Sequence, residues 1–311
     1  MKKINIIETS SYLPEKIITN EYMESIVETS DEWITTRTGI KTRRFAENQS
    51  NADMATQVAK QLIEKGKIAK EEIGALIVAT FTPDNFTPSV ACVVHKNLEL
   101  LEDVLTFDFN AACSGFVYGL QIAKGLLLQN PTKKAIVIGS EKISQHLNFE
   151  DRNTCILFGD GAGGVIMDLC DGEQDDEFLF GCRGNDTTIL CSAKDNHKLY
   201  MDGGEVFTFA VNTVVNCITN MLEKTKLTGD DIDYIVCHQA NERIIARAYK
   251  KLSLDAKKFF VNLDKYGNTS SASIPIALDE MNKQGLLKKN DKVMCIGFGS
   301  GLAYGATLLT W

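Results

Sequence analysis

A cysteine in a segment of small residues is the first candidate for chemistry in this sequence. Cys113 stands in FDFNAACSGFVYGLQIAKGLL, residues 107–127. The residues before it alternate between apolar and polar, as in a strand, and the apolar residues after it recur at helical spacing. Cys113 therefore falls at a strand-to-helix elbow, where the helix dipole should lower the pKa of a thiol from its usual ~8.5. We expect a nucleophile there, and the alternative is a buried, inert cysteine.

Two further polar side chains fall at the ends of expected elements. His238 closes the strand-like segment YIVCH and precedes the helical segment QANERIIARAYKKL. Asn268 lies in KYGNTSSASIPIAL, where a glycine and several hydroxyl residues predict a turn before a helix. Either residue alone is more often structural. Together with Cys113 they offer a nucleophile and two hydrogen-bonding groups, as covalent catalysis requires.

The elements that must position these residues alternate between strand and helix, which is typical of an α/β protein. Their order is repeated along the chain. IGALIVATFT resembles IDYIVCHQA, with Val78 matched to Val236, and AIVIGSEK resembles VMCIGFGS, with Ile138 matched to Ile296. Both pairs are 158 positions apart. This spacing predicts an internal duplication, although two α/β segments can also look alike without one.

The duplication predicts two halves, 1–172 and 173–311. Each half has a turn of small residues between its two matched strands. The turn of the first half holds Cys113, and the turn of the second holds Asn268, while His238 follows a strand of the second half. We therefore expect a site formed where the two halves meet.

Two glycine-rich segments have different expected roles. GDGAGG, residues 159–164, satisfies G-x-G-x-x-G, but the strand-like VIMDL follows it where a dinucleotide site needs a helix. We reject a nucleotide site. FGSGLAYGA, residues 298–306, joins two strand-like segments, and its glycines would let the backbone approach a substrate and turn an N–H group toward an oxyanion. A tight hairpin is the alternative for both.

Composition limits the class of protein. The 311 residues are 44% hydrophobic and 24% charged, with a net charge of −8, which disfavours a general nucleic-acid surface. No apolar segment approaches the roughly 18 residues needed to span a bilayer. The nine cysteines are scattered, which suits a reducing compartment, and the four histidines are not at metal-ligand spacing from them. We expect a cytoplasmic protein without a metal.

Six ordered motifs then resemble one family, the β-ketoacyl-acyl-carrier-protein synthase III enzymes of the thiolase superfamily. They are TSDEWITTRTGI, AACSGF, DRNTCILFGDGAG, HQANERI, GNTSSASIPIAL and GFGSGLAYGA. The resemblance implies a thiolase-like five-layered αβαβα fold of two similar halves with mixed sheets, and a homodimer. No bound cofactor is implied, because coenzyme A thioesters and the phosphopantetheine of acyl carrier protein are substrates.

The resemblance also implies the reaction. Cys113, His238 and Asn268 would be the catalytic residues, and the backbone N–H groups of Cys113 and Ser300 would bind an oxyanion. Cys113 would take an acyl group from acyl-CoA. Malonyl carrier protein would then lose carbon dioxide, and its carbanion would attack the acyl-cysteine to give 3-oxoacyl carrier protein. His238 and Asn268 would stabilise the enolate as neutral donors.

The same motifs imply which residues of this chain contact the substrates. Coenzyme A would contact Trp33, Arg37, Arg152 and Asn241. The acyl tunnel would be lined by Thr87, Phe158 and Phe298. Thr87 stands where acetyl-selective relatives have a bulky Phe that reaches across the dimer, so we expect a deeper pocket and longer or branched acyl groups. Carrier protein would dock on Arg243, Arg247 and Lys250, which share one face of a helix.

Other functions remain open on the residues alone. A synthase-III-like acyltransferase of secondary metabolism would have the same motifs but another acceptor. A Cys-His-Asn hydrolase would use the same three residue types, with the Asn orienting the His. In the synthase, by contrast, both the His and the Asn should face the substrate.

Overall fold

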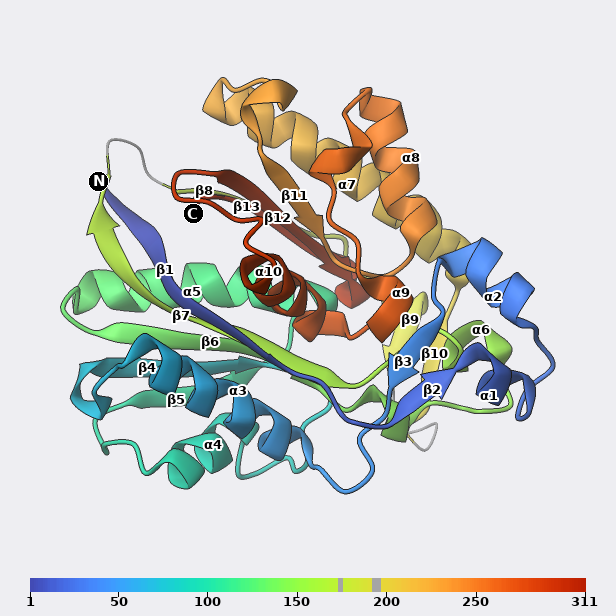
Figure 1. Ribbon diagram of the computed structural model, residues 1–311, viewed down its shortest axis with the longest axis horizontal. Coiled ribbons are helices and arrows are strands. Elements are labelled where there is room, and N and C mark those ends of the chain that lie inside the picture. The colour runs from blue at the N-terminus through green and yellow to red at the C-terminus, as the bar shows by residue number, and fades with distance from the viewer. Residues whose placement is uncertain (173–175, 192–196) are drawn as a thin grey trace.

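The computed structural model describes residues 1–172, 176–191 and 197–311. Two sheets lie face to face with helices between and outside them, which makes five layers (Figure 1). The predicted thiolase-like α/β fold is thus confirmed. Within the described ranges, no helix combines the length and apolar character needed to cross a bilayer.

The first sheet is built by the N-terminal half. Its order is β1-β7-β6-β4-β5, with β4 parallel to both β5 and β6 and the remaining pairs antiparallel. The bounds are β1 Lys2–Tyr12, β4 Ile73–Ala79, β5 Leu105–Phe109, β6 Lys134–Glu141 and β7 Gly161–Asp171. The central strands are apolar on both faces because helices cover both faces of the sheet.

The second sheet repeats this pattern with the C-terminal half. Its order is β8-β13-β12-β11, and β11 is parallel to β12 as β4 is to β6. The bounds are β8 Glu177–Cys182, β11 Tyr234–Cys237, β12 Lys292–Gly299 and β13 Ala303–Thr310. Beyond β11, Phe259 forms an isolated parallel bridge with Ile235, where β5 lies in the first sheet. The expected boundary at 172/173 borders residues 173–175, which lie outside the described residues.

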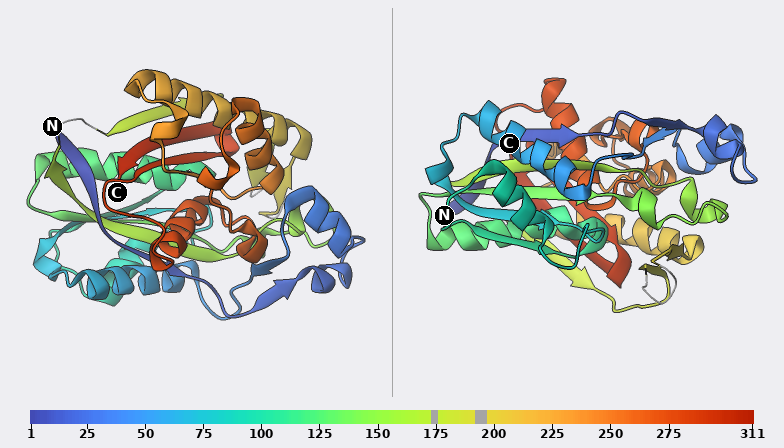
Figure 2. Two further views of the ribbon diagram at one scale, coloured as in Figure 1. Left: turned by 45° about the horizontal axis from the view of Figure 1, so that its top comes forward. Right: turned by 90° about the horizontal axis from the view of Figure 1, so that it is seen from below.

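Three pairs of helices complete the layers. Helices α5 (Gly115–Gln129) and α10 (Ser273–Lys283) lie between the sheets, where each packs against strands of both. Outside the first sheet lie α3 (Asn51–Gly66) and α4 (Val90–Leu98), seen in front when the molecule is viewed from below in Figure 2. Outside the second sheet lie α7 (Gly203–Thr225) and α8 (Glu242–Leu252).

Smaller elements gather at the end of the molecule away from the termini (Figure 1). They are β2 Ile17–Thr19, α1 Asn20–Glu24, α2 Asp31–Thr38, β3 Thr42–Arg44, α6 Arg152–Cys155, β9 Ile189–Cys191, β10 Leu199–Met201 and α9 Leu263–Tyr266. Short 3₁₀ turns include η2 Ala112–Ser114, η7 Ser270–Ala272 and η8 Ser300–Leu302. These pieces cover the ends of the strands that carry the expected site residues.

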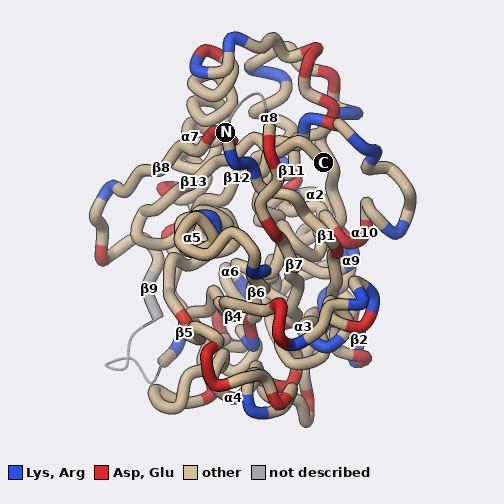
Figure 3. Tube along the Cα trace, turned by 90° about the vertical axis from the view of Figure 1, so that its left-hand side faces the viewer, with Lys and Arg blue, Asp and Glu red and all other residues tan. Residues whose placement is uncertain are grey.

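Local sequence explains the main helices. Helix α3 begins with a capping box, in which Ser50 and Asp53 each accept a hydrogen bond from the other's backbone N–H group. Helix α5 lies close to the first sheet because Gly119 has no side chain: a Cβ there would lie 2.7 Å from Cγ1 of Val137. Charged residues lie mainly on the outer helices and the loops, whereas the strands carry few (Figure 3).

The glycines at 159–164 lie mostly inside β7 and do not form a hairpin. A Cβ at Gly163 would lie 2.7 Å from the backbone nitrogen of Ile276, and one at Gly164 would lie 2.7 Å from the carbonyl oxygen of Val137. These glycines therefore allow α10 and the neighbouring strand β6 to pack closely on β7. The strand after them agrees with the rejection of a nucleotide site.

Candidate active site

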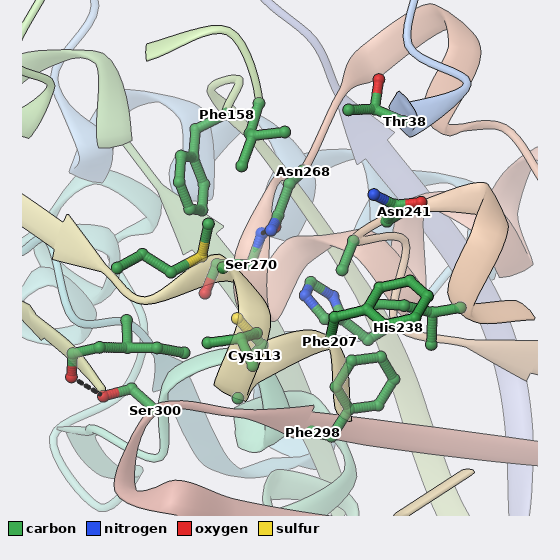
Figure 4. A pocket seen from close by; sticks show the side chains of 18 of the residues that line it. Thr38, Cys113, Phe158, Phe207, His238, Asn241, Asn268, Ser270, Phe298 and Ser300 are labelled. Atoms are coloured by element: carbon green, nitrogen blue, oxygen red, sulfur yellow. Dashed lines mark hydrogen bonds between the residues drawn. The ribbon is translucent and has the colours of Figure 1, made fainter. Parts of the chain in front are cut away.

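A cavity of about 870 Å³ opens where both halves of the chain meet (Figure 4). It lies beyond the carboxyl ends of β5, β11 and β12, where ligands of α/β sheets commonly bind. Ten of the expected site residues line it: Trp33, Arg37, Cys113, Phe158, His238, Asn241, Arg243, Asn268, Phe298 and Ser300. The cavity thus brings together the three residues expected to be catalytic.

Cys113 stands at the expected elbow, between β5 and α5. The turn is tight: Ala112 before it has φ 45°, and Ser114 donates its hydroxyl hydrogen bond to the carbonyl oxygen of Ala111. The expected lowering of the thiol pKa is wrong. Burial raises the pKa of Cys113 to about 12. Desolvation of the thiolate outweighs the helix end, although the side chain of Cys113 is only half-buried and lines the cavity.

His238 follows β11 and is neutral at physiological pH. Its Nδ1 lies 2.7 Å from Oγ of Ser273, at the start of α10, and its backbone N–H group donates to the carbonyl oxygen of Ile296 at 2.7 Å. Burial lowers the pKa of His238 to about 3. The ring meets Phe298 edge to face at 5.2 Å between centroids. With Nδ1 held by Ser273, Nε2 is the ring nitrogen left for a ligand.

Asn268 lies in the expected turn, between α9 and η7. Its Oδ1 accepts a hydrogen bond of 2.9 Å from the backbone N–H group of Ser270. Because the amide oxygen is held in this way, the side-chain NH₂ group is the part that can donate to a ligand in the cavity. In a Cys-His-Asn hydrolase the Asn would orient the His. Here Ser273 holds His238 instead, which disfavours that alternative.

The duplication extends to the turns of the site. Asn110 and Asn268 are 158 positions apart, and each accepts a hydrogen bond from the backbone N–H group two residues later. By the same spacing Cys113 corresponds to Ser271, so the residue matched to Asn268 is Asn110 and not Cys113. Asn110 also lines the cavity, although we did not predict it. The 158-residue spacing was the signal that could have found it.

Residues 298–306 form the alternative that we named for them, a tight hairpin between β12 and β13, and β12 passes directly against Cys113. A Cβ at Gly297 would lie 3.1 Å from the carbonyl oxygen of Cys113. At Gly299 it would lie 3.0 Å from Sγ and 3.2 Å from the backbone nitrogen of the same cysteine. The absence of both side chains therefore brings the backbone of Ser300, the expected second oxyanion donor, next to Cys113.

A cluster of cations and an aromatic ring lies at the mouth of the cavity. The guanidinium carbons of Arg37 and Arg152 lie 4.9 and 5.0 Å from the centroid of the Trp33 ring. Arg152 does not line the cavity itself, and it donates to the carbonyl oxygen of Glu28 at 3.1 Å. Asn241 caps α8 and donates to the carbonyl oxygen of Arg37 at 3.0 Å. The expected coenzyme A contacts thus lie side by side.

A second, smaller hollow of about 380 Å³ lies between α7 and α8. Arg247 and Lys250 line it, together with Phe207, Thr208, Val211, Asn212 and Lys251. Arg243 links this hollow to the main cavity, because both Arg243 and Arg247 lie over the ring of Phe207, at 5.6 and 5.0 Å. The three expected docking cations are exposed on one helix beside the cavity mouth.

Two of the three expected tunnel residues line the cavity, and the third does not. Phe158 and Phe298 are buried and line the cavity. Thr87 is exposed and does not line the cavity of the single chain. Its neighbour Phe86 is 95% exposed, so this loop carries a bulky ring one position before Thr87.

The part of the chain that the structure describes contains no group of three or more His, Cys, Asp or Glu side chains that could hold a metal ion. Eight cysteines with described side chains are free thiols.

Comparison with known proteins agrees with this geometry. Residues 107–184 match the sequence profile of 3-Oxoacyl-[acyl-carrier-protein (ACP)] synthase III, and residues 222–311 match that of its C-terminal part. The chain is 47% identical to the beta-ketoacyl-[acyl-carrier-protein] synthase III of Clostridium botulinum strain Hall, over 100% of this chain and 99% of that protein. The Clostridium acetobutylicum protein of the same description is 46% identical, with the same coverage.

A solved structure is similar over the whole length as well. The crystal structure of 3-oxoacyl-[acyl-carrier-protein] synthase III from Aquifex aeolicus has a TM-score of 0.93 with this chain and 41% identity. It covers 99% of this chain and 100% of its own. The chain therefore belongs to the 3-oxoacyl-[acyl-carrier-protein] synthase III family of acyltransferases.

Proposed function

We propose that this chain initiates fatty acid synthesis by condensing an acyl-CoA primer with malonyl-acyl carrier protein, using Cys113, His238 and Asn268. The observation that supports this assignment most strongly is the single cavity that a half-buried thiol, a neutral imidazole and a fixed amide all line. These are the three functional groups that the two halves of the reaction need.

The first half-reaction is acyl transfer to Cys113. Sγ attacks the thioester carbonyl of acyl-CoA, the bond from this carbonyl carbon to the CoA sulfur breaks, and the thiol proton passes to the departing CoA sulfur. Because burial keeps the thiol protonated, a base must take the proton as the S–C bond forms. In our proposal that base is the departing CoA sulfur, because His238, with its pKa lowered to about 3, keeps its Nε2–H for the second half-reaction. The backbone N–H groups of Cys113 and Ser300 bind the oxyanion.

The second half-reaction is decarboxylative condensation. Malonyl carrier protein loses carbon dioxide, and the electron pair of the broken C–C bond forms an enolate at the thioester. The Nε2–H of neutral His238 and the amide of Asn268 donate hydrogen bonds to the enolate oxygen. The enolate carbon attacks the acyl-cysteine, the cysteine sulfur leaves and takes up a proton, and 3-oxoacyl carrier protein is released.

The substrates enter by the mouth of the cavity in this proposal. The Trp33 ring and the guanidinium groups of Arg37 and Arg152 bind the adenine and the phosphates of coenzyme A. The exposed cations Arg243, Arg247 and Lys250 attract the acidic carrier protein, although the chain itself carries a net charge of −8. Use of these substrates favours a cytoplasmic location.

We further infer a homodimer in which the loop with Phe86 and Thr87 meets the partner subunit. The 95% exposure of Phe86 in the single chain supports this, because an isolated phenyl ring gains by burial. In the proposal Thr87 leaves room for acyl groups longer or more branched than acetyl. A strict preference for acetyl-CoA would contradict this. It would indicate that Phe86, rather than the residue at position 87, closes the acyl tunnel.

One experiment tests the proposed reaction. The protein is mixed with acyl-CoAs of increasing length and branching, its intact mass is measured, and malonyl carrier protein is then added. We expect one acyl group per chain, removal of that group by malonyl carrier protein, and no acylation of Cys113→Ala. Cys92→Ala, which removes an exposed thiol, should acylate normally. Acylation that persists in Cys113→Ala, or transfer only to hydroxyl acceptors as in secondary metabolism, would contradict the proposal.

A further inference from the structure

A fully buried carboxyl group lies behind the catalytic turns. Glu141 is the last residue of β6, and its side chain has no exposed surface. One oxygen, Oε2, lies near three donors: the hydroxyl of Thr80 at 3.1 Å, the backbone N–H of Phe81 at 3.2 Å and the hydroxyl of Thr82 at 2.6 Å. The other oxygen, Oε1, lies 2.8 Å from the hydroxyl of Ser271 in the second half.

Counting protons at Ser271 shows which form of Glu141 this network needs. The Ser271 hydroxyl also lies 2.9 Å from the carbonyl oxygen of Ala79. A hydroxyl has one hydrogen, so it cannot donate to both the carbonyl and an ionised carboxylate. If Oε1 of Glu141 carries a proton, the carboxyl group donates to Ser271 and Ser271 donates to Ala79. All three groups are then satisfied, which a buried network requires.

The position of Glu141 mirrors the catalytic site. Glu141 and Gly299 are 158 positions apart, as are Ser271 and Cys113. The backbone follows the same relation: a Cβ at Gly139 would clash with the carbonyl oxygen of Ser271, as one at Gly297 would lie 3.1 Å from that of Cys113. Glu141 thus faces Ser271 in the first sheet as Gly299 faces Cys113 in the second, where the missing side chain leaves room for the thiol.

The turn that Glu141 holds lies against all three catalytic groups. The backbone N–H of Ser270 holds the amide oxygen of Asn268, and the turn η7 packs against η2, which carries Cys113. Ser273 holds Nδ1 of His238. Displacement of Ser271 would therefore move all three groups.

We propose that Glu141 is a positioning residue, which as a neutral carboxylic acid holds the turn Ser270–Ser273 and thereby sets the geometry of Cys113, His238 and Asn268. The inference rests on the proposed function, because it assumes that these three residues carry the reaction. Glu141 itself does not line the cavity and acts only through the turn.

The same network makes the geometry sensitive to pH near neutrality. Burial raises the pKa of Glu141 to about 7, and the hydrogen bonds donated by Thr82, Phe81 and Thr80 oppose this only in part. Most of the groups around Glu141 do not titrate. Thr80 and Thr82 follow β4, Ser271 belongs to η7, and Asn51 of α3 hydrogen bonds with Thr80. Cys113, in η2, is the titratable group that faces Glu141. Lys142 follows Glu141 in the chain, but its ammonium group donates to the carbonyl oxygen of Gln49.

The test uses Glu141→Gln, which cannot ionise but can donate to Ser271, and Glu141→Ala, which cannot donate. Condensation by the wild type should fall as pH rises from 7 to 8.5, whereas Glu141→Gln should keep most of its rate and lose this fall. Glu141→Ala should lose about 10- to 100-fold in kcat with little change in KM for the acyl-CoA, because a buried network is left incomplete. Glu102→Gln, which removes an exposed carboxyl, is the control.

Infrared spectroscopy of the intact protein gives a readout that does not depend on activity. At pH 6 the wild type and Glu102→Gln should show the band of a protonated carboxyl group that is missing from Glu141→Gln. If this band is absent from the wild type, or if Glu141→Gln retains the alkaline fall, the inference is overturned even if Glu141→Ala does not fold. A wild type with the band but without condensation activity would instead overturn the proposed function.

Discussion

Burial sets the protonation state of the groups that face the cavity. The thiol of Cys113 has its pKa raised to about 12, and the imidazole of His238 has its pKa lowered to about 3, in both cases mainly by desolvation. Both groups are therefore neutral near pH 7. A neutral imidazole donates a hydrogen bond to an enolate without protonating it, which suits the condensation step better than an imidazolium would.

This state of His238 predicts the pH dependence of decarboxylation. An imidazole with its ordinary pKa would become protonated as pH falls through about 6.5. The folded protein delays this until the pH approaches 3, so the rate should not fall between pH 7 and 5.5. The measurement is carbon dioxide release from malonyl carrier protein by the acylated enzyme. A fall with a midpoint near pH 6.5 would contradict a neutral, buried His238.

Gly299 gives the sharpest steric prediction at the scale of single residues. In Gly299→Ala the new Cβ would lie 2.9 Å from Cβ and 3.0 Å from Sγ of Cys113, which forces the nucleophile to move. We expect acylation to slow by about 100-fold, measured by intact mass against time. Gly125→Ala, with nothing within 4 Å of its new Cβ, should acylate at the wild-type rate. Equal rates in the two variants would contradict the close approach of β12.

Helix ends and strand ends carry the site. Cys113 stands before α5, Ser273 begins α10, and His238 follows β11. The start of α10 thus orients a side chain from another element, since Ser273 lies 2.7 Å from Nδ1 of His238. Without this partner the imidazole can rotate or change tautomer.

Ser273→Ala should therefore affect the chemistry more than the stability. We expect a decrease of about tenfold in the rate of condensation, because one buried hydrogen bond of His238 is lost. Ser89→Ala is the matched control, since Ser89 caps α4 through the N–H group of Cys92 and does not line the cavity. Its melting temperature should fall without loss of condensation. If both variants lose activity in proportion to stability, Ser273 has no orienting role.

The sequence predicted the elements of the site well and their environment less well. Alternation, helical spacing and turn residues placed Cys113, His238 and Asn268 at element ends because those patterns are local. The thiol pKa was predicted in the wrong direction because burial depends on β12 and the second half of the chain. Glu141 and Ser273 were missed for the same reason: their partners Ser271 and His238 lie 130 and 35 positions away.

At the scale of the molecule, the two similar halves contribute different groups to the cavity. The first supplies Cys113, and the second supplies His238, Asn268 and the backbone next to the thiol. The repeat of order, strand direction and turn geometry was visible in the sequence as a constant spacing of 158 residues. In the homodimer that we propose, the loop with Phe86 and Thr87 meets a second copy, so the pattern of one chain does not explain the exposure of either residue.

The exposed face of α8 gives a prediction about the carrier protein. Arg243→Glu should weaken use of malonyl carrier protein, seen as a higher KM, because it reverses a charge beside the cavity mouth. Acylation by acyl-CoA should change little. Lys289→Glu, which reverses an exposed charge in the loop before β12, is the control. Equal losses in both half-reactions would show that Arg243 does not serve docking.

The separation of the two half-reactions tests the central claim most directly. Asn268→Ala should still take one acyl group from acyl-CoA onto Cys113, because in our proposal the amide serves only the enolate. Release of carbon dioxide from malonyl carrier protein should fall by about 10²- to 10³-fold, the usual effect of losing one oxyanion donor. Carbon dioxide release at the wild-type rate by fully acylated Asn268→Ala would contradict the assignment of this cavity as the site of condensation.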